Sequence, residues 1–212
     1  MPCKVCGLAL MDCRCLPKAM EDAGITEMIA RVPYRAGGGS VPDRVLFSIK
    51  AERTPEVFSF LAEELRPAVA LLLKNREILP QDALLTALPR RREAILRHGF
   101  DQAVELCRAL SKESGIPYRR ILLRHSFTAE EKTLSAEERV ENCRRAFYTR
   151  FSSNALDGRT VLLVDDLVTT GSSLSAGAEL LYRLGAKEVV AVVVGRTNDD
   201  TEYKSGRFSP FT

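Results

Sequence analysis

Two adjacent carboxylates and a hydroxyl-rich loop form the densest group of chemically useful residues in the sequence. Asp165 and Asp166 follow the apolar run 161–164. The loop after them contains Thr169, Thr170, Gly171, Ser172 and Ser173. Backbone N–H groups, hydroxyls and the positive end of a helix together bind a monophosphate, and a glycine lets the ligand approach the backbone closely. Because carboxylates accept hydrogen bonds from vicinal ribose hydroxyls, the segment predicts a site for a five-carbon sugar phosphate.

Three other interpretations of this segment fit less well. An apolar strand ending in two aspartates is typical of the Mg²⁺ strand of a P-loop ATPase, but the sequence contains no G-x-x-x-x-G-K-[ST] motif. A receiver domain also carries strand-end carboxylates, yet it requires more chain than the 46 residues that follow Asp166. A buried strand before an N-capped helix explains Ser172 but gives no reason for two carboxylates beside the loop.

Four cysteines near the beginning of the sequence form a second chemical group, a C-x-x-C pair followed by a C-x-C pair. They are Cys3, Cys6, Cys13 and Cys15. Thiolates at this spacing can converge on one tetrahedral Zn²⁺, whose binding energy replaces the core that so short a segment cannot form. We therefore predict a structural zinc knuckle over residues 1–20. Because no export signal is recognisable, we expect reduced cysteines and a cytoplasmic protein.

Alternating apolar runs and amphipathic helices predict the elements that position the carboxylates. We expect strands at 84–88, 121–123, 161–164 and 189–194, and helices at 101–114 and 172–184. This alternation indicates an α/β fold with a parallel sheet, in which sites lie at the carboxyl ends of strands. The longest apolar runs fall far short of the roughly 20 residues that cross a bilayer, so we expect no membrane span.

The region between the cysteines and residue 80 is predicted to be mostly helical. Thr54 and Pro55 begin a helix whose apolar spacing continues to Leu73 across a kink at Pro67. Residues 45–50 fit either a strand or a short helix. We expect residues 21–79 to pack on the core and residues 80–212 to form the main α/β domain.

The charge is concentrated in the middle of the chain. The net charge is +3, whereas residues 89–150 alone hold 14 basic and 9 acidic side chains. A local excess of positive charge suits a bound polyanion of limited size. A solvated arginine-rich face is equally compatible with it.

Residues 161–173 resemble the phosphoribosyl pyrophosphate (PRPP) signature of type I phosphoribosyltransferases. Residues 88–102, 134–139 and 142–147, together with the cysteines, resemble the ComF (ComFC-like) competence proteins over nearly the whole chain. The resemblance implies a type I phosphoribosyltransferase-like parallel sheet with flanking helices in residues 80–212, plus an N-terminal zinc knuckle. It also implies a link to single-stranded DNA uptake during natural transformation.

The resemblance also implies roles for individual residues. Asp165 and Asp166 would hold the ribose hydroxyls, and the loop from Thr169 to Ser173 would hold the 5′-phosphate. The loop 89–100 would face the pyrophosphate and its Mg²⁺ and would supply the donors Arg90, Arg91 and Arg97. A solvated run is the alternative interpretation of residues 90–92.

The polar stretch 125–145 lies where related transferases carry a mobile lid. Lys132, Arg139 and Arg144 would then close over the pyrophosphate and exclude water, with Arg139 joining Arg97 and the two aspartates as catalytic residues. Residues 135–142 can equally form a capped helix.

Three further positions bear on the resemblance to this family. Glu131 and Asp101 stand where the family often has Gln and Asn, and their negative charges oppose pyrophosphate unless they face away. Lys50 matches a common family lysine whose role is open.

Two functions of different classes follow. The first is a phosphoribosyltransferase that displaces pyrophosphate from the ribose C1, with an acceptor that the sequence does not identify. The second is a non-catalytic PRPP-binding module that acts with single-stranded DNA and competence proteins.

Overall fold

Four parallel strands form the central sheet of this computed structural model, which describes residues 6–8, 13–34, 40–125, 143–197 and 203–204. Their order is β2 (Glu27–Tyr34), β7 (Glu188–Thr197), β6 (Thr160–Val168) and β3 (Ala83–Ala87). The three strands β3, β6 and β7 are almost continuously buried, because helices cover both of their faces. The parallel α/β sheet predicted from the sequence is confirmed.

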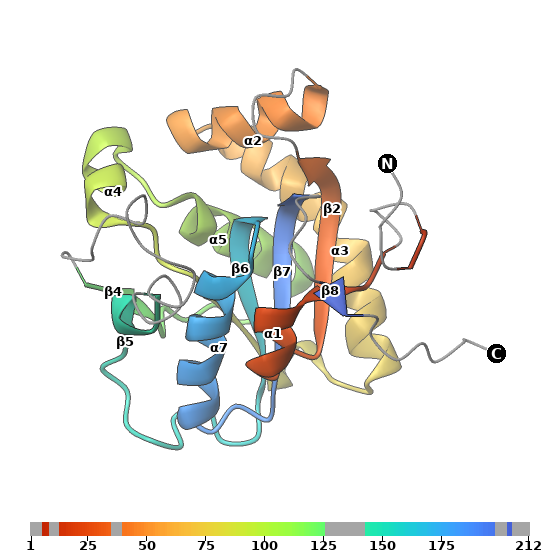
Figure 1. Ribbon diagram of the computed structural model, residues 1–212, viewed down its shortest axis with the longest axis vertical. Helices are drawn as coiled ribbons and strands as arrows, with labels where there is room; N and C mark the ends of the chain where they lie inside the picture. The colour runs from red at the N-terminus through yellow and green to blue at the C-terminus, as the bar shows by residue number, and fades with distance from the viewer. Residues whose placement is uncertain (1–5, 9–12, 35–39, 126–142, 198–202, 205–212) are drawn as a thin grey trace.

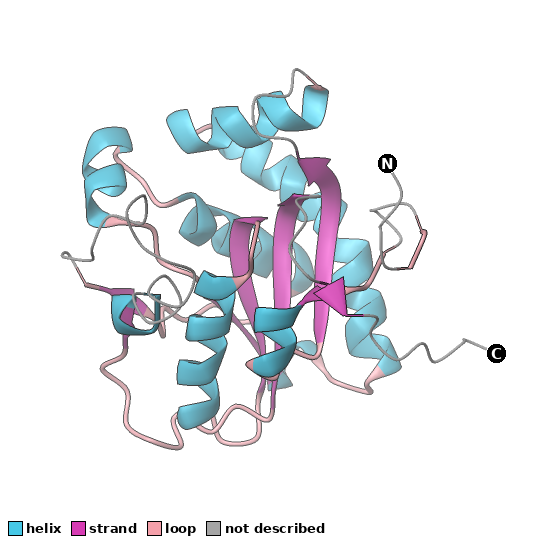
Figure 2. Cartoon of the chain, viewed as in Figure 1, coloured by secondary structure: helices cyan, strands magenta, loops and turns pink. Residues whose placement is uncertain are grey.

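Helices lie on both faces of the sheet (Figures 1 and 2). One face carries α1 (Lys18–Asp22) and α7 (Ser172–Arg183), and the other carries α2 (Val41–Ala51), α3 (Pro55–Asn75) and α5 (Gln102–Ser114). Successive strand residues point to opposite faces, so Leu163 packs with Leu181 of α7 whereas Leu162 belongs to the cluster that contains Leu106 of α5. Two separate apolar clusters therefore fix the sheet between its helices.

Smaller elements complete the described chain. The strands β4 (Leu123–Arg124) and β5 (Phe147–Tyr148) pair antiparallel, as do β1 (Leu16–Pro17) and β8 (Tyr203–Lys204). A 3₁₀ turn, Pro80–Asp82, precedes β3, and α4 (Arg92–His98) follows it. No helix within the described ranges combines the length and the apolar content that a bilayer span requires.

Two predicted segments differ from the structure. The strand predicted at 121–123 is wrong as a member of the sheet: Ile121 and Leu122 are fully buried, but only β4 follows them, paired with β5. Apolar residues predict burial, and burial here is reached without strand pairing. The predicted loop 89–100 contains α4. None of the residues of α4 is buried, so the sequence shows little of the apolar periodicity that predicts a helix. Gly99 ends this helix in a left-handed conformation.

Residues 21–79 contribute a strand as well as helices. β2 forms one edge of the central sheet, with Met28 and Ile29 buried beside β7. The ambiguous residues 45–50 belong to α2, and α3 continues through Pro67 without a break. This region therefore shares the core sheet, while the domain boundary at residue 80 stays a prediction.

Candidate functional site

The end of β6 and the loop after it have the geometry of an anion site at a helix N-terminus. Thr169 and Thr170 are exposed, and Gly171, with φ of 80°, directly precedes α7. The carbonyl of Gly171 accepts hydrogen bonds from the N–H and the hydroxyl of Ser175, each at 2.9 Å. The hydroxyl groups of Thr170 and Ser172 lie 3.0 Å apart. Hydroxyls and the first N–H groups of α7 therefore gather at one point.

Asp166 is held by two other elements of the fold. Its Oδ2 lies 3.4 Å from Lys50 Nζ at the end of α2 and accepts a 3.1 Å hydrogen bond from Gln102 Nε2 at the start of α5. The residue is only 7% exposed, so these contacts compensate a carboxylate that has lost most of its water. Lys50, whose role the sequence left open, thus contacts one of the two predicted ribose-binding carboxylates.

Asp165 lies beside Asp166 and has a different environment. Its Oδ1 accepts a 2.8 Å hydrogen bond from the backbone N–H of Asp166. Desolvation and the adjacent Asp166 carboxylate raise the pKa of Asp165 well above its usual value. The two neighbours therefore differ: a cation and an amide donor face Asp166, while Asp165 tends to keep a proton.

This raised pKa predicts a gain in stability on removing the Asp165 charge. A carboxyl whose pKa is raised by folding stabilises the protein below the unfolded-state pKa and loses that contribution as pH rises through the folded pKa. We expect Asp165→Asn to increase the free energy of unfolding at pH 8 by about 1 kcal/mol. The gain should shrink as the pH falls toward 4. Urea unfolding at both pH values measures it, with the exposed Asp157→Asn as control; a gain independent of pH would contradict the assignment.

A pocket of about 250 Å³ opens beside the two carboxylates. It is lined by Leu88, Pro89, Arg90, Arg91, Ala94, Asp101, Gln102, Ala103, Arg124, Asp165, Asp166 and Ser173. Five residues predicted for the site thus meet around one cavity: the two aspartates, Ser173, Arg90 and Arg91. Residues 169–172 lie outside the lining.

Two other predicted cations that the structure describes, Arg97 and Arg144, do not line this pocket. Arg97 is exposed in the last turn of α4. Arg144 forms a two-pronged ion pair with Glu179 of α7, with nitrogen-to-oxygen distances of 2.8 to 3.2 Å. Arg139, together with Lys132 and Glu131, lies outside the described residues, so its predicted role stays a prediction.

Arg90 lines the pocket and contacts two neighbouring segments of the chain. Its guanidinium donates two hydrogen bonds to the carbonyl of Lys50, both 3.2 Å long, and its backbone N–H donates to Asp101 Oδ2 at 2.9 Å. The role of Arg90 as a pyrophosphate donor stays a prediction, and the contacts described tie the end of α2 to the loop after β3. Arg90 therefore positions Lys50 at the site.

Asp101 directs its charge toward the backbone. Its Oδ1 accepts hydrogen bonds from the N–H groups of Ala103 and Val104, which caps α5, while its Oδ2 accepts from Arg90. Burial raises the pKa of Asp101, and these three hydrogen bonds oppose that shift. The negative charge that was expected to oppose pyrophosphate is thus compensated by backbone donors.

The Asp101 cap predicts a local stability effect. Asp101→Ala removes the acceptor for three backbone N–H groups and is expected to lower the free energy of unfolding by about 1–2 kcal/mol. Thermal unfolding followed by circular dichroism measures the loss. An unchanged midpoint would show that the cap contributes nothing.

Two residues at the site were not predicted to act there. Gln102 donates to Asp166, and Arg124 lines the pocket with its guanidinium 5.0 Å from the centre of the Phe147 ring. Gln102 falls within a stretch that carried the family resemblance. Nothing in the local pattern around Arg124 distinguishes it from the other arginines of the middle segment.

The cysteine cluster has the geometry of a metal site. The Sγ atoms of Cys6, Cys13 and Cys15 lie within 4.8 Å of one another, and Cys13 and Cys15 are buried. Among the described cysteines all five are unbridged. Three converging thiols fit a thiophilic metal ion. The fourth predicted ligand, Cys3, lies outside the described residues.

Comparison with known proteins finds a matching family and related chains. Residues 94–208 match the family described as "Phosphoribosyl transferase domain". Competence protein F of Haemophilus influenzae is 39% identical over 94 residues, which cover 44% of this chain and 41% of that protein. DNA utilization protein YhgH of Escherichia coli (strain K12) is 32% identical over 155 residues, covering 72% of this chain and 66% of that protein. The matched segments thus span less than two thirds of both relatives.

A solved hypoxanthine phosphoribosyl transferase of Trypanosoma cruzi is also similar. It superimposes with a TM-score of 0.46 at 18% sequence identity, covering 75% of this chain and 74% of that one.

Proposed function

Because this chain belongs to the phosphoribosyl transferase domain family, we propose that it binds PRPP at the carboxyl end of β6. One observation carries the proposal: Asp165 and Asp166 share a pocket with Ser173, directly beside a glycine-containing loop that opens α7. A carboxylate pair next to an anion-binding helix start matches a ribose ring that carries a 5′-phosphate.

Each part of PRPP has chemically suitable partners around this pocket. The ribose hydroxyls donate to the carboxylates, and the 5′-phosphate accepts from the N–H and hydroxyl groups of residues 169–173. The pyrophosphate lies toward Arg91 and Arg124, which also line the pocket, since guanidinium groups bind phosphate oxygens in pairs. Lys50 and Gln102 keep Asp166 in place for the sugar.

The reaction that this arrangement suits is displacement of pyrophosphate from the ribose C1. The bond from C1 to the pyrophosphate oxygen breaks, pyrophosphate leaves with the bonding electrons, and the nucleophilic atom of the acceptor forms the new bond to C1. Positive charge develops on the ring next to the two carboxylates during this exchange. The protein contributes positioning and electrostatic stabilisation. Carboxylate oxygens suit Mg²⁺, which the aspartate pair and the pyrophosphate would hold and which would neutralise the leaving charge.

The thiol cluster is proposed to bind structural Zn²⁺, with Cys3 as the fourth ligand. Thiolate ligands favour Zn²⁺, and four protein ligands leave no position for a substrate. Reduced thiols persist in the cytoplasm, where we therefore place the protein.

A second candidate function is a non-catalytic PRPP-binding module that acts with single-stranded DNA and competence proteins. The names of the relatives, Competence protein F and DNA utilization protein YhgH, favour this alternative. The excess of basic over acidic side chains in residues 89–150 is compatible with it.

One experiment separates the two candidates. The protein is incubated with PRPP, Mg²⁺ and a panel of nucleobases, and released pyrophosphate is measured alongside PRPP binding by calorimetry. Turnover with one base supports the transferase. Saturable PRPP binding without turnover, together with salt-sensitive binding of single-stranded DNA, supports the module. Absence of PRPP binding contradicts both.

A further inference from the structure

A buried arginine attaches the cysteine segment to the central sheet. Arg196 of β7 is 1% exposed, and its guanidinium donates to the carbonyl of Cys13 at 3.2 Å and to that of Cys15 at 3.4 Å. Both cysteines belong to the thiol cluster. One side chain thus holds the backbone of the C-x-C pair.

Arg196 lies beside the strand that leads into the phosphate loop. In the parallel ladder between β6 and β7 its partner is Val168, the last residue of β6. Thr169 follows immediately. A shift of the C-x-C backbone would therefore be transmitted to the strand next to the loop.

A second, independent contact joins the same two regions. Residues that follow Cys15 pack against the loop: a Cβ atom built on Gly171 would lie 2.5 Å from Met20 Cγ and 3.3 Å from Pro17 Cβ. Met20 is fully buried, and α1 lies against α7. Figure 1 shows α1 and α7 side by side on one face of the sheet. The loop conformation thus depends on where the end of the cysteine segment places Met20.

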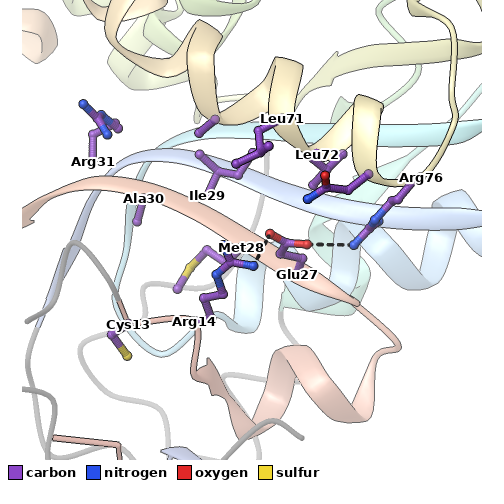
Figure 3. Close-up of a pocket in the computed structure, with 12 residues that line it drawn as sticks. Cys13, Arg14, Glu27, Met28, Ile29, Ala30, Arg31, Leu71, Leu72 and Arg76 are labelled. Carbon is purple, nitrogen blue, oxygen red and sulfur yellow. Dashed lines mark hydrogen bonds and ion pairs between the residues drawn. The ribbon is translucent and has the colours of Figure 1, made fainter. Parts of the chain in front are cut away.

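Arg14, between the two cysteines, is attached elsewhere. Its guanidinium lies 3.8 Å from Glu27 of β2, which also pairs with Arg76 at 2.8 Å (Figure 3). These residues border a separate cavity of about 510 Å³ between β2 and α3. The Arg14 side chain is 60% exposed and pairs with β2, so Arg14→Gln controls for the loss of an arginine charge near the cysteines.

We propose that Arg196 is a positioning residue that couples metal binding at the cysteine cluster to phosphate binding at residues 169–173. The coupling deepens, and rests on, the proposed PRPP site. With metal bound, the C-x-C segment has one fixed shape, which holds both the Arg196 hydrogen bonds and the Met20 contact. Such coupling is reciprocal, so PRPP must tighten metal binding by the same factor by which metal tightens PRPP binding.

The test follows zinc release from the full-length, zinc-loaded protein into a zinc-selective chromophoric chelator, with and without PRPP and Mg²⁺. We expect PRPP to raise the apparent zinc affinity about 5-fold or more, the lower end of typical coupling factors. Arg196→Gln should accelerate zinc release and remove the PRPP effect. Arg14→Gln, the same chemical change at the exposed side chain between Cys13 and Cys15, should retain it.

Calorimetry of PRPP with the same proteins distinguishes failure of the coupling from failure of the proposed PRPP site. If PRPP binds but leaves zinc release from the wild-type protein unchanged, the coupling is wrong while the PRPP site stands. If PRPP does not bind even the zinc-loaded wild type, the proposed function fails and the coupling fails with it. The release experiment uses the folded wild-type protein, so its outcome holds even where Arg196→Gln does not fold.

Discussion

Asp166→Ala is expected to weaken PRPP binding by about 1–3 kcal/mol, the value of a lost charge-assisted hydrogen-bonding group. The substitution removes the acceptor for the ribose hydroxyls. It also leaves the Lys50 ammonium and the Gln102 amide, 3.4 Å and 3.1 Å from the carboxylate, without their shared partner. Isothermal titration calorimetry with PRPP and Mg²⁺ measures the affinity.

Two controls make the Asp166 result specific. Circular dichroism should show an unchanged fold, and Asp82→Ala, at an exposed carboxyl in the 3₁₀ turn, should bind PRPP like the wild type. An affinity that Asp166→Ala leaves unchanged would remove this residue from the site. The contacts of Lys50 and Gln102 with Asp166 would then have no part in PRPP binding.

Gly171→Ala is expected to have the second large effect, on both stability and PRPP binding. The left-handed φ of 80° disfavours a side chain by about 1–2 kcal/mol. The added Cβ would also lie 2.5 Å from Met20 Cγ, and overpacking of this kind typically adds about 1–3 kcal/mol. Urea unfolding and PRPP titration measure the two losses.

A second glycine separates the two contributions. Gly158 has a similar φ of 68°, but a Cβ there would meet nothing within 4 Å. Gly158→Ala should therefore show the backbone effect alone, without loss of PRPP affinity. Combining Gly171→Ala with Met20→Ala should relieve the overlap but retain the backbone strain. Equal destabilisation by the two single glycine substitutions would contradict tight packing of Met20 on the loop.

The resemblance to ComF competence proteins and the parallel sheet, both predicted from the sequence, are confirmed by the family match and the fold. The order of β6, the loop and α7 was predictable because adjacent residues encode it. An apolar run, then carboxylates, then a hydroxyl-rich turn favour a strand, a loop and a helix in that order. For the same reason the C-x-x-C and C-x-C spacing was enough to predict converging thiols.

Other parts of the site depend on residues far apart in the chain. Lys50 and Gln102 reach Asp166 from helices on the far face of the sheet, and Arg90 turns toward the Lys50 carbonyl. No periodicity records such contacts, because they arise only when α5 packs against β6 and α2 packs against β2. The edge position of β2 was missed for a related reason, since pairing with β7 is what makes that segment a strand.

The sequence by itself determined which chemistry this chain carries: a carboxylate pair before a phosphate-type loop, and a cluster of thiols. Short-range spacing sets both, so neither needs the rest of the fold to be recognised. Only the tertiary structure decided what surrounds them. Packing of distant elements placed a lysine and an amide on Asp166 and a buried arginine on the cysteine backbone, because burying those charges requires partners that only the assembled core can supply.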